Sequence, residues 1–133
     1  KPISMDYYFS KVLNCPFNEA VDKVTLLLKE QGFGIITQID VKETFKVKLD
    51  KDFRDYKILG ACNPNFAFDA LGAEDRVGLM LPCNVIVQDK GDGKTEVAAV
   101  NPKMVMESIG NPALTDLSCK VTEILDNVIK KLS

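Results

Sequence analysis

The fold is decided by the stretch VGLMLPCNVIVQDKGDGKTEVAA, residues 77–99. Apolar side chains alternate with others from Val77 to Val87, and a second alternation runs from Thr95 to Ala99. A period of two residues is typical of a strand with one buried face. Between the two runs, the segment DKGDG has the composition of a hairpin turn. The stretch therefore predicts two antiparallel strands joined by a tight turn.

Pro82 interrupts the first of these predicted strands. Proline cannot donate a hydrogen bond to a sheet ladder, so we expect a bulge or an unpaired edge position there. Strict alternation places Cys83 on the apolar face with Leu81 and Val85. A bulge that shifts the register would instead turn Cys83 toward Cys62 on a neighbouring strand.

Upstream of the hairpin, the sequence predicts a helix between strands. Residues 5–13 alternate as a first strand, and residues 17–28 carry apolar side chains at the three- and four-residue spacing of an amphipathic helix. Gly32 is placed to end that helix in the left-handed conformation. Residues 33–39 and 56–61 then predict two further strands.

Three helix starts are marked by capping residues. Asp40 and Glu43 form a capping box that predicts a short helix over residues 41–49, although the apolar residues there would also alternate in a strand. The dipeptides Asn63-Pro64 and Asn111-Pro112 each combine a capping side chain with a proline suited to the first helical position. The second dipeptide opens a long C-terminal helix whose apolar stripe contains Leu114, Leu117, Val121, Ile124, Leu125, Val128 and Leu132.

The predicted order is strand, helix, four strands with short helical insertions, helix. This order predicts an α+β fold in which a curved, mainly antiparallel sheet carries two long helices on one face. A chain of 133 residues lies in the size range of one domain. Glycine and proline fall singly at the predicted turns, so nothing indicates a linker. We therefore expect residues 1–133 to form one domain.

Composition excludes several classes of function. The chain has 17 basic and 19 acidic residues, which argues against nucleic-acid binding because phosphate contacts need a concentrated positive surface. Histidine is absent, and with it the commonest acid-base group at neutral pH and the commonest metal ligand. No apolar run approaches the roughly 20 residues of a membrane-spanning helix. We expect no nucleic-acid partner, no membrane span and no cofactor.

The four cysteines, at positions 15, 62, 83 and 119, are spread over a chain that needs no disulfide for stability. We expect reduced thiols and favour the cytoplasm as the compartment. The chain begins at Lys1 rather than at methionine, so we expect that a tag or a signal peptide preceded it. Export after cleavage of a signal peptide is the alternative location.

Three motifs carry a resemblance to a known family: Gly32-Phe33-Gly34 leading to Asp40, Gly60-Ala61-Cys62-Asn63-Pro64, and Leu81-Pro82-Cys83-Asn84-Val85. On these motifs, which with their flanking helices span nearly the whole chain, the sequence resembles the domain of unknown function 302 family. The resemblance implies a fold like one half of the TATA-binding protein, with a curved sheet backed by two helices. It also implies a homodimer. The family has no established reaction, so the resemblance implies no mechanism.

One departure from the family pattern bears on chemistry. Where members often have histidine or tyrosine in the helix after the first cysteine motif, this sequence has Phe68. A mechanism that pairs the Cys62 thiol with a histidine base is therefore excluded. The chain shows no identifiable catalytic pair, and we favour a protein that is not an enzyme.

The candidate site residues are Asp40, Cys62, Asn63, Pro64, Cys83 and Asn84. Cys62 precedes a predicted helix, whose free amides and positive dipole end would stabilise a thiolate. We favour the other explanation, that it is a small apolar residue filling a tight corner, because the sequence shows no base or cation near it.

The other candidates also have structural explanations. Asp40 and Asn63 fit helix caps, and Asn84 fits a partner for backbone groups freed at the predicted bulge. A closed zinc site would require Cys15 and Cys119 to converge on the other two thiols. We expect Cys15 in a loop and Cys119 in the core, so no metal site is predicted.

The leading hypothesis is a homodimeric domain that binds a small molecule or a partner through a pocket near Cys62 and Cys83. The alternative is a thiol-based redox or sulfur-handling protein in which Cys62 is the more acidic thiol and Cys83 its resolving partner. A third hypothesis is a structural dimer without a ligand.

Overall fold

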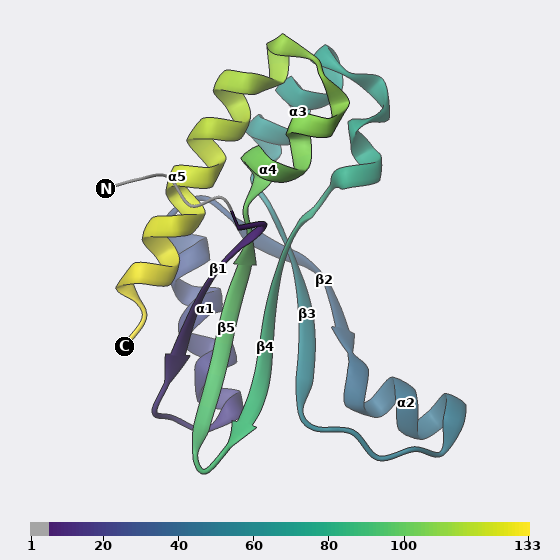
Figure 1. Cartoon of the computed structure of the whole chain (residues 1–133), viewed down its shortest axis with the longest axis vertical. Coiled ribbons are helices and arrows are strands. Elements are labelled where there is room, and N and C mark those ends of the chain that lie inside the picture. Colours follow the sequence, from purple (N-terminus) through teal and green to yellow (C-terminus); the bar gives the residue numbers. More distant parts are fainter. Residues whose placement is uncertain (1–5) are drawn as a thin grey trace.

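The computed structural model describes residues 6–133 and shows a five-stranded sheet in the order β1-β5-β4-β3-β2 (Figure 1). Every neighbouring pair of strands is antiparallel. Met5, at the start of the predicted first strand, lies outside the described residues. The strands are β1 (Tyr8–Leu13), β2 (Gly34–Asp40), β3 (Tyr56–Cys62), β4 (Cys83–Gly91) and β5 (Lys94–Val100).

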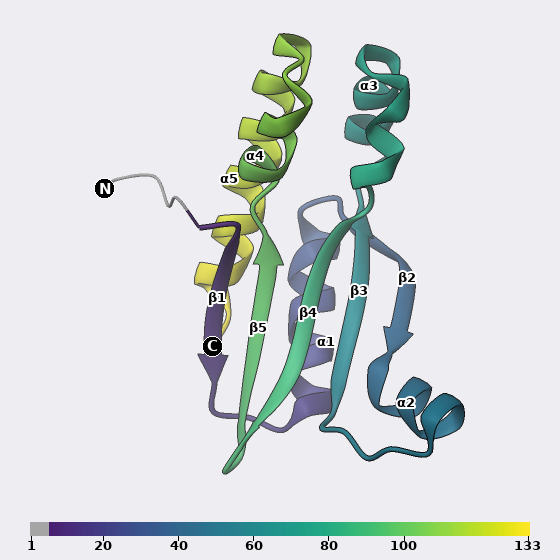
Figure 2. The same cartoon turned by 45° about the vertical axis from the view of Figure 1, so that its right-hand side comes forward.

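Two long helices cover one face of this sheet, α1 (Phe17–Glu30) and α5 (Thr115–Lys131). Both lie behind the strands in the view of Figure 2. Each helix turns an apolar stripe toward the sheet, as an amphipathic helix must if it is to bury that stripe. The predicted α+β fold, with an antiparallel sheet and helices, is confirmed.

The main core lies between the sheet and these two helices. Because side chains alternate along a strand, each strand gives every second residue to this face. Among the fully buried side chains are Leu28 of α1, Leu59 of β3, Val85 and Val87 of β4, Val97 of β5 and Leu125 of α5. We call this side of the sheet the covered face.

Beyond one end of the sheet, short helices form two arms (Figure 2). One arm contains α3 (Pro64–Ala73) and the 3₁₀ helix η1 (Asp75–Met80). The other contains α4 (Pro102–Met106), the turns η2 (Glu107–Ile109) and η3 (Pro112–Leu114), and the first turns of α5. A second, small apolar cluster joins the arms through Ala70, Val77 and Leu114.

Two of the three helix starts predicted from capping residues are confirmed, whereas Asn111 caps η3 and the long helix α5 begins only at Thr115. Gly32 has φ of +84° just after α1, in the left-handed region that glycine adopts without strain. Asp40 caps α2 (Val41–Leu49), since its Oδ1 accepts a hydrogen bond of 3.0 Å from the Glu43 amide. The alternative of a strand over residues 41–49 is wrong. Asn63 likewise caps α3, accepting from the amides of Asn65 and Phe66.

The predicted strand between Val77 and Leu81 is wrong. Residues 75–80 form η1, and β4 begins only at Cys83, after a cis peptide bond between Leu81 and Pro82. The apolar alternation has another cause, because Val77 is buried in the second cluster while Leu79 is exposed. The predicted bulge at Pro82 is also wrong: Cys83 pairs with Ala61, and the register runs on without interruption.

Helix α4 was not predicted, although Asn101-Pro102 repeats the dipeptide that marks the other helix starts. Asn101 is fully buried and joins three parts of the chain. Its side-chain amide donates to the carbonyl oxygen of Asp6, and its side-chain oxygen accepts from the Thr122 hydroxyl of α5. The side chain thus ties the segment that precedes β1 to α5 where the second arm begins.

Candidate functional site

The two cysteine motifs meet where β3 ends and β4 begins. The lack of a side chain at Gly60 makes this close contact sterically feasible. A Cβ atom at Gly60 would overlap the Thr37 hydroxyl and would lie 2.6 Å from Cγ of Pro82. Gly60 therefore gives Pro82 of the second cysteine motif room beside the first. This close approach explains why glycine stands two residues before Cys62.

A second contact joins the glycine motif to the first cysteine motif. A Cβ atom at Gly32 would lie 2.9 Å from the side-chain nitrogen of Asn63, so the cap of α3 sits directly on the turn that ends α1. Next to it, the rings of Phe33 and Phe66 stack with centroids 6.2 Å apart. These contacts fix how α3 leaves the sheet.

A cavity of about 50 Å³ lies between the two arms, at the end of the covered face. We call it the motif cavity. It is partly open to solvent, and nearly all of its wall is apolar. The sheet contributes Ala61, Cys62 and Cys83, the first arm contributes Phe66, Ala67 and Ala70, and the second arm contributes Met106, Leu117, Ser118 and Val121.

Cys62 and Cys83 both border this cavity, and they differ in exposure. Cys83 is 8% exposed, whereas Cys62 is half-buried. Burial, together with the neighbouring Cys62, raises the pKa of Cys83 from its ordinary value of 9.0 to about 11. All four cysteines lie within the described residues and are free thiols.

The structure brings together three of the six predicted site residues. Cys62, Asn63 and Cys83 line the motif cavity. Pro64 is the first residue of α3 and is exposed beside it. Asp40 caps α2 at the far end of β2, and Asn84 projects from the opposite face of the sheet. The proposed backbone role of Asn84 at a bulge is wrong, because that bulge does not exist.

The structure also places Phe68, whose side chain is 80% exposed on α3 and does not border the motif cavity. This position therefore does not point at Cys62. The prediction that Cys119 lies in the core is wrong: its thiol is exposed. The buried stripe of α5 runs through its neighbour Ser118 instead, which is about 100° away around the helix.

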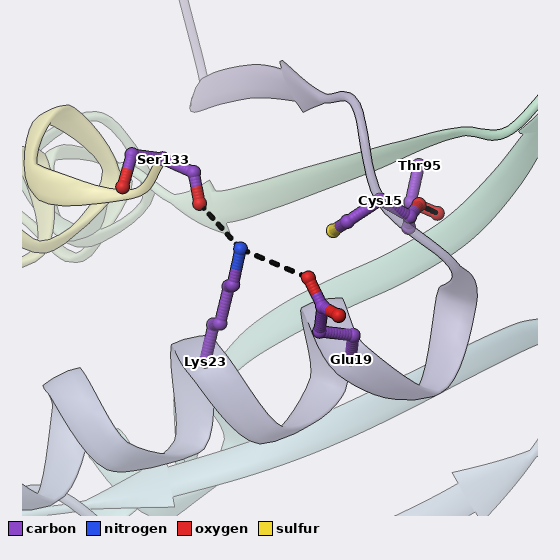
Figure 3. Close-up of polar contacts among 5 residues, drawn as sticks. All are labelled: Cys15, Glu19, Lys23, Thr95 and Ser133. Carbon is purple, nitrogen blue, oxygen red and sulfur yellow. Dashed lines mark hydrogen bonds and ion pairs between the residues drawn. The ribbon is translucent and has the colours of Figure 1, made fainter.

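Cys15 lies between β1 and α1, as predicted, and its thiol is buried (Figure 3). Burial raises its pKa, and nearby Lys23 opposes this shift only in part. Figure 3 shows why Lys23 is a weak activator: its ammonium group contacts Glu19 at 3.1 Å and the Ser133 carbonyl oxygen at 2.6 Å. Cys15 is thus a packing residue.

Sequence analysis missed a second concave surface, on the face of the sheet opposite the helices. This open face has a hollow of about 460 Å³, bordered by Tyr8, Tyr56, Asn84, Ile86 and Val100 among others. Part of the signal was present in the sequence, because Tyr56, Ile58, Ile86, Ala98 and Val100 belong to the second set of alternating residues, although Asn84, Gln88 and Glu96 belong to it too. An open antiparallel face normally carries polar side chains.

Within residues 6–133, no three histidine, cysteine, aspartate or glutamate side chains lie together as metal ligands. None of the helices in this range is long and apolar enough to span a membrane.

The chain is similar to a protein family and to solved structures. No curated protein matches it significantly. Its structure is similar to the crystal structure of an uncharacterized conserved DUF302 protein from Bacillus stearothermophilus, with a TM-score of 0.86 and 27% identity. The similarity covers 96% of this chain and 98% of that one. The family model "Domain of unknown function DUF302" matches residues 9–132, and the chain therefore belongs to the DUF302 family.

Proposed function

We propose that this protein is a homodimeric binding domain, not an enzyme, and that the motif cavity takes the apolar group of a small molecule. The observation that carries the proposal is the cavity itself. It is a half-open, apolar slot at the point where Cys62, Asn63 and Cys83 converge. Ligand sites are typically concave and apolar with a few polar groups.

The size of the cavity limits what enters it. A volume of about 50 Å³ is well below the roughly 300–1,000 Å³ of sites that enclose a whole drug-sized molecule. The slot therefore suits a short alkyl chain or a similar narrow group, while the polar part of the ligand stays outside. The side chains of Asn63 and Ser118, at the wall, supply the few polar atoms.

A methionine of the wall provides the test. Met106 borders the cavity, whereas Met80 lies on η1 outside it. In protein labelled with methyl-¹³C methionine, titration with 1-hexanol should shift the Met106 methyl signal to saturation and leave Met80 unchanged. An unmoved Met106 signal would overturn the proposal.

Two alanines of α3 provide matched variants for this titration. Ala67→Leu fills the cavity and should abolish the Met106 shift, whereas Ala73→Leu, on the exposed side of the same helix, should preserve it. Equal loss in both variants would show that the shift does not report the cavity.

We further propose that the homodimer forms through the open face. One row across that face contains Ser10, Ala98, Ile86, Ile58 and Ile39, in register on all five strands and without a charge. Five strands of about six residues project roughly 500 Å². The solvent-accessible area of such a surface is larger than its projected area. It therefore approaches the area that each partner buries in a stable interface, about 800 Å². A second copy is the occupant that best matches this extent.

Sedimentation equilibrium tests the dimer directly. We expect the mass of two chains at micromolar concentration. A monomer throughout that range would contradict this part of the proposal.

We also propose that residues 1–133 form one domain and that its sheet and long helices correspond to one half of the TATA-binding-protein fold. The order β-α-β-β-β-β-α, apart from the short helices, supports the correspondence. Limited proteolysis that released two stable fragments would contradict the single domain.

The second candidate is thiol-based redox or sulfur chemistry, favoured by the electrostatic influence of Cys62 on Cys83. The burial of Cys83 also weighs against it. A resolving thiol with a pKa of about 11 stays protonated at neutral pH and attacks a disulfide slowly. Treatment with the oxidant diamide distinguishes the two: a Cys62–Cys83 disulfide would favour redox chemistry, and two intact thiols would favour binding.

A further inference from the structure

A second hollow lies beside the motif cavity, within the second arm. It has a volume of about 330 Å³ and is bordered by residues of α4, η2, η3 and the first turn of α5. We call it the arm hollow. Met106, Leu114 and Ser118 border both the arm hollow and the motif cavity, so these side chains form a wall that the two spaces share.

Two opposite charges border the arm hollow. Lys103 is half-buried on α4, and Glu107 is exposed one helical turn later, at the start of η2. Among residues 6–133, neither side chain forms a salt bridge with the other or with a third residue. The wall of the motif cavity contains no charged residue. The two spaces together thus offer a cation and an anion at one end and an apolar slot at the other.

Hydrogen bonds hold the backbone around these charges in place. The Lys103 amide donates to the Thr122 hydroxyl of α5 at 3.0 Å. Asn111, in the loop between α4 and α5, donates from its side-chain amide to the Ala73 carbonyl oxygen of the first arm, also at 3.0 Å. The second arm is therefore fixed to both neighbours, and the charged ends of Lys103 and Glu107 remain to bind a ligand.

From this arrangement we infer that the two spaces together bind an α-amino acid with a short, unbranched apolar side chain. Lys103 binds the carboxylate of the ligand, and Glu107 binds its ammonium group. The side chain of the ligand passes Met106 into the motif cavity, because an unbranched methionine adapts its shape readily. The inference rests on the proposed function of the cavity and names a ligand class for it.

The pair of charges selects the zwitterion over simpler amphiphiles. An alkyl carboxylate would bring its negative charge close to Glu107, and an alkylammonium ion would bring its positive charge close to Lys103. Like charges brought together are unfavourable, whereas a zwitterion satisfies both groups. Size agrees, because the arm hollow reaches the lower end of the roughly 300–1,000 Å³ of ligand sites and the motif cavity alone does not.

Ligands of equal carbon number test the role of the charges. Protein labelled with methyl-¹³C methionine would be titrated at neutral pH with 1-hexanol, hexanoate, hexylammonium and L-norleucine, with the Met106 signal as the readout. We expect L-norleucine to bind at least about tenfold more tightly than 1-hexanol, because hydrogen bonds between charged groups are the strong ones. Hexanoate and hexylammonium should bind no more tightly than 1-hexanol.

Matched variants assign the charges to residues. Lys103→Gln and Glu107→Gln should each remove the advantage of L-norleucine, a loss of at least about tenfold, and leave the affinity for 1-hexanol unchanged. The unchanged alcohol affinity shows that the cavity is intact. Lys120→Gln is the control, since Lys120 is exposed on α5 and borders neither space, and both affinities should persist.

Two results would overturn the inference. One is hexanoate that binds as tightly as L-norleucine, because the site would then recognise an anion. The other is an advantage of L-norleucine that survives in Lys103→Gln or in Glu107→Gln.

The 1-hexanol titration separates the two levels of the proposal. If 1-hexanol shifts Met106 but L-norleucine binds no more tightly, the cavity remains a binding site and the amino-acid inference fails. If no ligand shifts Met106, the proposed function fails with it.

Discussion

The two faces of the sheet are made from alternate residues of the same strands, yet they end in different surfaces. The covered face packs under α1 and α5 and leaves a narrow cavity at its end, next to Cys83. The open face presents a broad, shallow hollow with tyrosines at its border. We propose that the first surface takes a small ligand and the second a second copy of the chain. On this proposal, ligand binding and assembly should each be open to disruption without the other.

The largest expected effect contrasts neighbouring residues of β3. Leu59 is 1% exposed in the main core, and Leu59→Ala should lower the free energy of unfolding by about 2–5 kcal/mol. Ile58 points to the open face, and Ile58→Ala should cost less than about 1 kcal/mol in dilute monomer. Urea denaturation at two protein concentrations checks both values. Only the Ile58 effect should grow with concentration, and equal concentration dependence would erase the distinction between the faces.

The next effect concerns assembly. Ile58→Asp places a charge in the centre of the open face and should weaken the homodimer at least about 100-fold, because a charge buried without a partner is costly. Leu26→Asp is the control, since Leu26 is exposed on α1 away from that face. Sedimentation equilibrium reports both variants. A dimer that survives Ile58→Asp but not Leu26→Asp would move the interface to the helices.

Alkaline pH should test the covered face through Cys83. Its pKa rises from 9.0 to about 11 on folding, so between these values the unfolded chain loses a proton that the native chain keeps. The contribution of the Cys83 thiol to the free energy of unfolding is therefore fully present below pH 9. It falls by about 2–3 kcal/mol as pH rises through 11. The difference in urea stability between wild type and Cys83→Ala, measured from pH 8 to 11, isolates the contribution. A constant difference would show that Cys83 is accessible to solvent.

The smallest expected effect tests the packing contact between the two cysteine motifs. Gly60→Ala should destabilise the fold by about 1–3 kcal/mol, because the added Cβ meets Thr37 and Pro82. Gly34→Ala is its match on β2, where a Cβ atom meets no atom within 4 Å. Thermal unfolding should separate the two variants. Similar melting temperatures would mean that the motif glycine is not required by packing.

The helix boundaries were predictable because they depend on local chemistry. The side chains of Asp40 and Asn63 satisfy amides two or three residues away, so the sequence alone carries the information. Helix α4 begins at the same Asn-Pro dipeptide, but the Asn101 side chain makes no capping hydrogen bond and contacts Asp6 and Thr122 instead. The strand predicted at Val77 was wrong because long-range packing decides the structure there. The Val77 side chain is buried in the cluster between the arms rather than against a sheet.

The candidate site was only partly predictable for the same reason. The motifs placed Cys62 and Cys83 on neighbouring strands, and the structure brings both to one cavity. The second arm, including Met106 and Ser118, comes from residues far along the chain, and no local pattern links it to the cysteines. The face on which Asn84 lies required the true start of β4, which sequence analysis misplaced.

The most direct test of the central claim, that the motif cavity binds a ligand while the open face binds a second copy, is a crystal structure with 6-bromo-1-hexanol. The account predicts an anomalous bromine peak between the arms, beside Phe66 and Met106, and a two-fold contact across the open face. Bromine found only on the open face, with the space between the arms closed, would contradict it.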